Sequence, residues 1–154
     1  MKTRLKQAAI VLAALVIVAQ FLRPNRTNPP TDPQRTIHAQ AGISSGLTAV
    51  LDRSCRDCHS HNTVWPWYTA VAPVSWAMAY AVKEGRKAVN FSEWTAYAPE
   101  QQQALLAQSC ASVSAGRMPG AYSVLHPATR LSSRDIEAVC AASREIRAQA
   151  STGR

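Results

Sequence analysis

The chain has 154 residues, and 17 Lys and Arg against 9 Asp and Glu give it a formal net charge of +8 at pH 7. This length leaves room for about one small domain beside an N-terminal segment. Much of the basic excess lies at the start of the chain, where no acidic residue precedes Thr27. The basic residues there are Lys2, Arg4, Lys6, Arg23 and Arg26. The rest of the chain is only slightly basic, so the charge indicates membrane targeting and excludes a nucleic-acid-binding protein.

Residues 8–22 form an uncharged and strongly apolar run directly after Lys2, Arg4 and Lys6. A basic stretch followed by such a run is the layout of an export signal. The run is short for a membrane span of about 20 residues, but side chains at its ends can reach the interface. Because no good cleavage site follows it, we expect residues 1–22 to stay as a signal-anchor or transmembrane segment. The N-terminus would then be cytoplasmic and the rest of the chain exported.

Residues 23–42 contain four of the nine prolines, with Asn, Thr and Gln between them. This composition predicts an extended linker that lies outside the core. We expect the linker to hold a domain at residues 43–150 away from the bilayer.

A predicted helix beginning near Ser44 leads into the most informative stretch of the chain. Leu47, Val50 and Leu51 fall on one helical face, and Cys58 continues the same spacing. The helix therefore brings its apolar face and the thiols to the same side.

Residues 55–59 read Cys-Arg-Asp-Cys-His, a C-x-x-C-H pattern. This is the attachment pattern of c-type haem, in which each thiol adds across one vinyl group of the porphyrin. His59 then lies under the iron as the proximal ligand. The pattern predicts one covalent haem c on Cys55 and Cys58.

Two other kinds of site share part of this pattern. A thioredoxin-like dithiol requires a βαβ context, which the surrounding sequence lacks. A zinc site requires two more ligands. The chain offers Cys110, Cys140, His61 and His126 for this purpose, but no second C-x-x-C and no H-x-x-x-H.

Three large aromatic residues follow the motif at Trp65, Trp67 and Tyr68, around a proline. This composition favours a loop that covers a flat apolar cofactor. An ordinary aromatic core cluster is the alternative.

The next predicted helix begins at Pro73, a residue type tolerated in the first turn, and ends at Gly85. Arg86 lies just beyond it, where it would pair with a haem propionate or form a solvated helix cap.

A further helix is predicted from Pro99 to about Ser114, and Gly116 ends it. Met118 follows on a Met-Pro-Gly loop, where a thioether can be presented without competing for space in the core. Because of this position, Met118 is the predicted sixth ligand of the iron. Thioether ligation opposite a histidine is the combination that raises the haem potential. His126 and an iron with an open or water-bound position are the alternatives.

The last helix is predicted after a capping box formed by Ser132 and Asp135. Cys140 falls on its apolar face, and Cys110 falls on the apolar face of the preceding helix. In an exported protein such a pair forms a disulfide or remains as two buried thiols.

The order of several segments resembles the membrane-anchored bacterial haem-binding domain family, a group of small monohaem proteins similar to c-type cytochromes. The segments are QFLRPNRTNPP, CRDCHSHNTVWPWY, APVSW, EGRKAVNFSEW and GRMPGAYSVLHPATRLS. The resemblance implies covalent haem on Cys55 and Cys58, a proximal His59, and a domain outside the bacterial inner membrane, facing the periplasm or cell exterior. By wider analogy with small class I cytochromes c, the Pro73 carbonyl would accept a hydrogen bond from His59 Nδ1–H.

Together these features predict an all-α, cytochrome c-like domain of about four helices around one haem, preceded by a membrane helix. One-electron transfer is the expected function, with an unidentified protein as redox partner. A haem-based sensor with a displaceable sixth ligand is the alternative. No catalytic base, nucleophile or substrate pocket is recognisable in the sequence, so we do not expect an enzyme, although a peroxide-type activity remains compatible with it.

Overall fold

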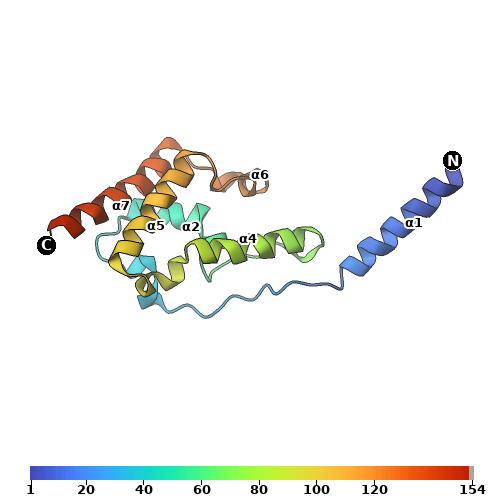
Figure 1. Ribbon diagram of the computed structural model, residues 1–154, viewed down its shortest axis with the longest axis horizontal. Coiled ribbons are helices and arrows are strands. Elements are labelled where there is room, and N and C mark those ends of the chain that lie inside the picture. Colours follow the sequence, from blue (N-terminus) through green and yellow to red (C-terminus); the bar gives the residue numbers. More distant parts are fainter. Residues whose placement is uncertain (153–154) are drawn as a thin grey trace.

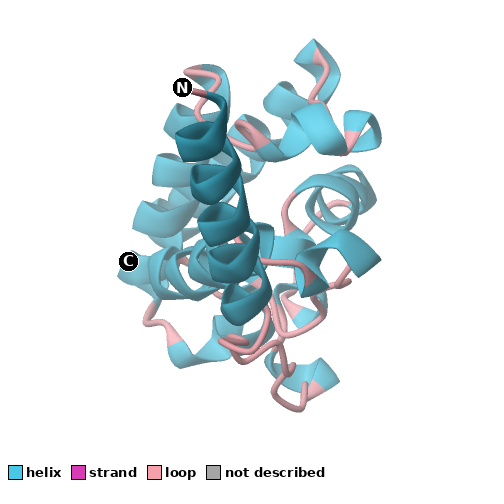
Figure 2. Ribbon diagram, turned by 90° about the vertical axis from the view of Figure 1, so that its right-hand side faces the viewer, coloured by secondary structure: helices cyan, strands magenta, loops and turns pink. Residues whose placement is uncertain are grey.

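The structure is a computed structural model that describes the backbone of residues 1–152 and the side chains of residues 1–146. Its α-helices are α1 (Lys2–Ala19), α2 (Ser45–Ser54), α3 (Arg56–His59), α4 (Val74–Ala88), α5 (Pro99–Ser114), α6 (Tyr122–Leu125) and α7 (Ser133–Thr152). Short 3₁₀ turns lie at Pro33–Arg35, Ile37–Ala39, Trp67–Ala70, Phe91–Ala96 and Pro127–Thr129. Residues 1–152 contain no strand (Figure 2), which confirms the predicted all-α class.

The core forms where α5 packs along α7 and α2 packs against α7, while α3 lies on α4 (Figure 1). The apolar face predicted for α2 is buried, with Leu47, Val50 and Leu51 all inside. Trp94 is fully buried among them. Helical spacing of apolar residues therefore predicted the inward face of α2 correctly.

The predicted capping box begins α7. The Ser132 N–H donates to Asp135 Oδ2 at 2.7 Å, and the Asp135 N–H donates to Ser132 Oγ at 3.3 Å. The Ser132 N–H and the Ser132 hydroxyl, which donates to the same Oδ2 at 2.7 Å, lower the pKa of Asp135 to about 2, with a smaller effect of the Arg53 guanidinium at 2.8 Å. The Asp135–Arg53 pair also joins the start of α7 to the end of α2.

Cys110 and Cys140 form a disulfide between α5 and α7, with their Cα atoms 4.8 Å apart. The structure thus settles the two open alternatives for this pair in favour of the bond. It also removes both sulfurs as ligands for a zinc site, because a bonded cysteine has no thiolate to offer.

Gly85 does not end α4, contrary to the prediction, since the helix continues to Ala88. Gly85 is buried against the backbone of Cys58. A Cβ added there would lie 2.9 Å from the Cys58 carbonyl carbon and closer still to its oxygen. The glycine is therefore placed for close approach of α4 to α3, and not as a helix stop.

The helix α1 extends away from the other helices (Figure 1), and its apolar side chains are exposed all round. Within residues 1–152, no helix combines the length and the apolarity that a membrane span requires.

Residues 23–42 differ from the predicted free linker, because they pack against the domain. Ile37 is fully buried in the core, and Asn28 Nδ2 donates to the Thr63 carbonyl at 2.8 Å. The ring of His61, itself buried, lies with Nδ1 3.1 Å from the Pro30 carbonyl. The folded unit therefore begins well before residue 43.

Candidate functional site

A cleft opens between the end of α2, the short α3, the end of α4 and the inner faces of α5 and α7, and the loop after α5 closes one side. Its walls are mainly apolar and include Leu51, Phe91, Leu105, Val113, Leu131 and Val139. Leu105 and Val113 lie on α5, and Val139 lies on α7. What the sequence did not reveal is that these side chains surround the C-x-x-C-H motif.

The two thiols of the motif lie together on one wall of this cleft. Cys55 is the residue at which α2 ends and α3 begins, and Cys58 follows one helical turn later. Burial, with a smaller effect of Cys58, raises the pKa of Cys55 to about 12. Burial, with a smaller effect of Asp57, raises the pKa of Cys58 to about 11. A redox-active dithiol has a lowered thiol pKa, so these values argue against thioredoxin-like chemistry.

His59 lies on the same wall, with Nδ1 3.2 Å from the Val89 carbonyl. The ring donates this hydrogen bond through Nδ1–H, which leaves Nε2 with the free lone pair that a metal requires. Burial lowers the pKa of His59 and so favours the neutral imidazole. Neutral imidazole is the ligating form.

The acceptor for the His59 Nδ1–H is therefore the Val89 carbonyl. The analogy with class I cytochromes c predicted the Pro73 carbonyl, and that prediction is wrong. The Pro73 carbonyl is used in the first turn of α4, where it accepts from the N–H groups of Trp76 at 3.1 Å and Ala77 at 3.3 Å. Pro73 lies at the far end of the helix from His59. A backbone acceptor such as Val89 has no side-chain signature, so the sequence offered no sign of it.

Met118 lines the cleft together with Cys55, Cys58 and His59, from the loop between α5 and α6. Gly116 and Gly120 on either side adopt positive φ angles of 67° and 57°, which shape this loop. His126, the alternative ligand, is outside the cleft lining. Its ring stacks on Tyr122 at a centroid distance of 4.2 Å.

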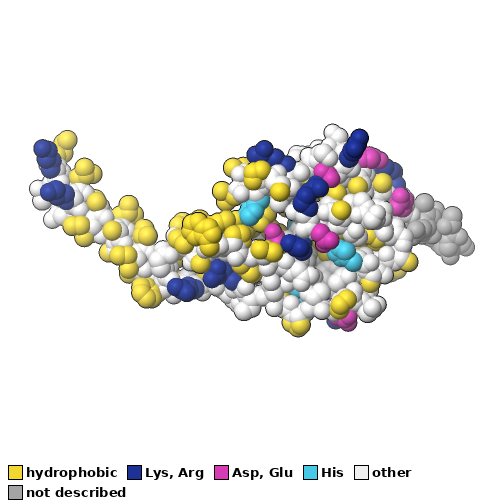
Figure 3. Space-filling model, turned by 180° about the vertical axis from the view of Figure 1, so that it is seen from behind, with side chains coloured by type: hydrophobic (Ala, Val, Ile, Leu, Met, Phe, Trp, Pro, Cys, Tyr) yellow, Lys and Arg dark blue, Asp and Glu magenta, His cyan; other side chains and the backbone are white. Residues whose placement is uncertain are grey.

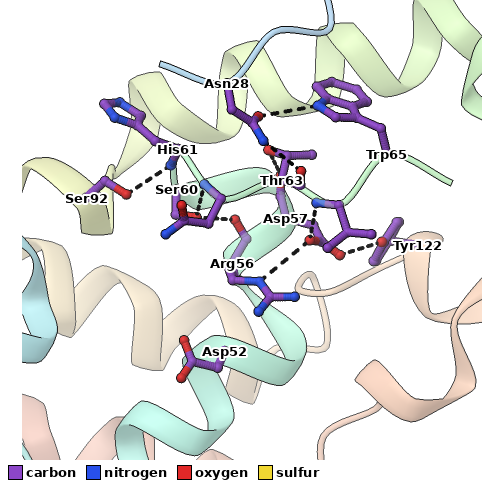
Figure 4. Close-up of polar contacts among 12 residues, drawn as sticks. Asn28, Asp52, Arg56, Asp57, Ser60, His61, Thr63, Trp65, Ser92 and Tyr122 are labelled. Atoms are coloured by element: carbon purple, nitrogen blue, oxygen red, sulfur yellow. Dashed lines mark hydrogen bonds and ion pairs between the residues drawn. The ribbon is translucent and has the colours of Figure 1, made fainter. Parts of the chain in front are cut away.

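None of the three aromatic residues that were predicted to cover the cofactor lines the cleft. Trp67 is 81% exposed, and Trp65 Nε1 donates to Asn28 Oδ1 at 3.3 Å (Figure 4). Tyr68 contacts the His126 ring through its hydroxyl. The loop after α3 is drawn toward α4 and the N-terminal segment, and Phe91 and Tyr122 supply the aromatic rings of the cleft instead.

Arg86 also lies outside the cleft lining, contrary to the predicted propionate contact. Its Nε donates to the Ser60 carbonyl at 2.7 Å, and its Nη2 donates to Thr63 Oγ1 at 2.9 Å and Asn28 Oδ1 at 3.0 Å. Arg86 therefore fastens the loop that follows the motif, and the N-terminal segment with it.

The residues of the cleft fit a large flat apolar group that carries a metal. Two thiols and an imidazole share one wall, a thioether faces the same space, and apolar side chains fill the rest. The hydroxyl of Ser54, buried beside Cys55 on the cleft wall, has no hydrogen-bond partner among the described residues. A buried hydroxyl without a partner is uncommon, and a water or a bound group in the cleft would satisfy it. A zinc site is not supported, since no group of three or more His, Cys, Asp and Glu gathers in the part of the chain that the structure describes.

Comparison with known proteins gave a match at the family level. A search of curated proteins and a search of solved structures each gave no significant match. The model of the haem-binding domain family matches residues 14–144, a range that contains every residue of the cleft. The chain therefore belongs to the haem-binding domain family.

Proposed function

We propose that the cleft holds one haem c, bound covalently through Cys55 and Cys58, with His59 as the proximal ligand. The observation that carries this proposal is the placement of both thiols and the His59 ring on one wall of an apolar cleft. Family membership supports haem as the cofactor. The spacing of the two thiols supports covalent attachment.

We propose one-electron transfer as the function, with Met118 as the second axial ligand. When bound, the haem supplies a metal that alternates between two oxidation states. The Val89 carbonyl accepts a hydrogen bond from His59 Nδ1–H and so orients the ring. This hydrogen bond also makes the imidazole a stronger ligand. Leu105, Val113 and Val139 keep the cleft apolar, and the Met118 thioether favours the reduced state. Protein ligands on both sides of the haem iron suit an electron carrier better than an enzyme, because an enzyme needs an open coordination position for its substrate.

Membrane attachment through α1 is part of the same proposal, with the haem domain outside the cytoplasmic membrane. It is supported by the uncharged apolar run at residues 8–22 behind three basic residues, and by apolar side chains that find no partner on the domain (Figure 3). A helix that is hydrophobic all round and unburied in the protein requires another apolar environment.

The domain would then lie close to the membrane, because the end of α1 is hydrogen-bonded to it. The Gln20 side chain accepts from the Ala72 N–H at 3.0 Å and donates to the Ala72 carbonyl at 3.4 Å. Trp76 Nε1 donates to the Leu22 carbonyl at 2.7 Å. Trp76 is 40% exposed at this junction, and tryptophan is favoured at membrane–water interfaces. We therefore propose a domain docked near the membrane in place of the predicted spacer.

A haem-based sensor is the alternative, and one observation favours it. Met118 is 47% exposed on a loop, so a thioether there has room to leave the metal and admit a small ligand. The two functions differ in how readily the reduced protein binds carbon monoxide.

Replacing Met118 with alanine tests the proposed ligation. In the haem-loaded parent we expect a thioether-to-iron absorption band when oxidised and little carbon monoxide binding when reduced. Met118→Ala is expected to lose the band, to bind carbon monoxide readily, and to have a reduction potential lower by on the order of 0.1 V, within the range of about 0.8 V that axial ligands set. Spectroscopy and a redox titration provide these values.

Met78→Ala is the matched control, since Met78 lies on α4 outside the cleft lining and is partly buried. It is expected to keep the band and the potential of the parent. Ready carbon monoxide binding by the parent itself would favour the sensor, and an unchanged spectrum in Met118→Ala would exclude Met118 as the ligand.

A further inference from the structure

The loop that carries Met118 has little structure of its own to fix its position. Its backbone hydrogen bonds are local turns, such as Ser123 N–H to the Gly120 carbonyl at 3.2 Å and His126 N–H to the Tyr122 carbonyl at 3.0 Å. The helix α6, which follows this loop, is a single turn long. Local turns set the shape of the loop, but its placement over the cleft depends on contacts with other elements.

One such contact reaches the haem-attachment motif itself. The Tyr122 hydroxyl donates to Asp57 Oδ2 at 2.8 Å (Figure 4), and both residues line the cleft. Asp57 stands between Cys55 and Cys58 in the C-x-x-C-H pattern. The bond therefore joins a residue four positions after Met118 to the wall that carries the thiols.

The Asp57 carboxylate is held in place from its other side. Its Oδ1 accepts the Val64 N–H at 2.9 Å, and its backbone carbonyl accepts the Thr63 hydroxyl at 2.7 Å. The acceptor that Tyr122 meets is thus already oriented by the loop after α3. A hydrogen bond to a preoriented, charged acceptor is among the stronger kinds in proteins.

The Tyr122 side chain is restrained as well. Its ring stacks on His126, whose ring in turn contacts the Tyr68 hydroxyl. Burial raises the pKa of Tyr122, and the bond to Asp57 adds to the effect. The hydroxyl therefore remains a proton donor at neutral pH.

We propose that Tyr122 is a positioning residue, whose hydroxyl bond to Asp57 holds the Met118 loop against the haem-attachment motif. The consequence for ligation rests on the proposed function, since it requires Met118 to be the sixth ligand. The restraint on the loop does not depend on that function. Loop restraint and iron ligation are therefore measured separately.

Hydrogen exchange of residues 117–126 in the full-length, haem-loaded protein tests the restraint. Tyr122→Phe removes only the hydroxyl, and Asp57→Asn keeps an oxygen for Val64 while it replaces the oxygen that accepts from Tyr122. Each variant is expected to speed exchange in this segment by about 10-fold or more, the effect of losing a hydrogen bond to a charged group. The double variant is expected to add little, because each change alone removes the bond from the Tyr122 hydroxyl to a charged carboxylate.

Tyr80→Phe is the matched control, since it also loses one hydroxyl but lies on α4 and is 67% exposed. Its exchange in residues 117–126 is expected to equal that of the parent. The proposal is overturned if Tyr122→Phe leaves exchange of the segment unchanged, or if the effects of Tyr122→Phe and Asp57→Asn multiply in the double variant.

Carbon monoxide binding to the reduced protein gives the second readout. Tyr122→Phe is expected to bind carbon monoxide about 10-fold or more faster than the parent, while Tyr80→Phe does not. If the parent binds it as fast as Met118→Ala does, the proposed Met118 ligation fails, and the exchange measurement still decides the role of Tyr122. If exchange quickens but carbon monoxide binding does not, Tyr122 orders the loop without holding the ligand, and the proposal is overturned for ligation.

Discussion

Alanine at position 85 is expected to destabilise the protein by about 3 kcal/mol, although alanine is the better helix former. A Cβ at this position would lie 2.9 Å from the carbonyl carbon of Cys58 and 3.1 Å from its Cβ. Backbone atoms cannot rotate away as a flexible side chain does, so α4 must separate from α3. Separation also weakens the contact of His59 with Val89, the residue that follows the last turn of α4. We therefore expect less haem incorporation as well as lower stability.

Urea unfolding of Gly85→Ala and of Gly46→Ala separates packing from helix propensity. Gly46 lies near the start of α2, is exposed, and has only the Ser44 hydroxyl, at 3.9 Å, near an added Cβ. Gly46→Ala is expected to be neutral or stabilising by up to about 1 kcal/mol. If both variants were stabilised alike, the close approach of α4 to the attachment motif would not be present in solution.

Loss of the disulfide is expected to lower the free energy of unfolding by about 3.5 kcal/mol. The bond closes a loop with a sequence separation of 30 residues, and chain entropy predicts a stabilisation of this size. It also ties α5 to α7, which form the largest helix contact of the core. Cys110→Ala combined with Cys140→Ala is therefore expected to shift the urea midpoint strongly, measured on protein exported to an oxidising compartment.

A reductant provides the control for this prediction. Reduction of the parent protein is expected to lower its urea midpoint toward that of the double variant, which has no disulfide and should not respond. A midpoint in the double variant equal to that of the oxidised parent would show that the bond does not contribute to stability.

Several features of the fold were predictable because they depend on local sequence. The helix Pro99–Ser114, the capping box of Ser132 and Asp135, and the buried face of α2 follow from proline, cap and spacing rules that act within a few residues. The C-x-x-C-H pattern was recognisable for the same reason, since it lies in five consecutive residues.

Other features depend on contacts between distant segments and had no local signature. The Val89 carbonyl that holds His59 is a backbone group, and Gly85 has the same sequence appearance as a helix stop. The aromatic loop was expected over the cleft because it follows the motif in sequence. Arg86 and Asn28 draw that loop to the other side of the motif, and they come from elements far away in the chain.

The central claim is covalent attachment of one haem to Cys55 and Cys58, and its most direct test is haem retained after denaturation. The protein is produced with a c-type maturation system and denatured, and covalent haem per chain is counted by its pyridine haemochrome spectrum. We predict one haem per chain in the parent and none in the variant that carries both Cys55→Ser and Cys58→Ser. Loss of all haem from the denatured parent, or equal retention by the double variant, would contradict covalent attachment at these thiols.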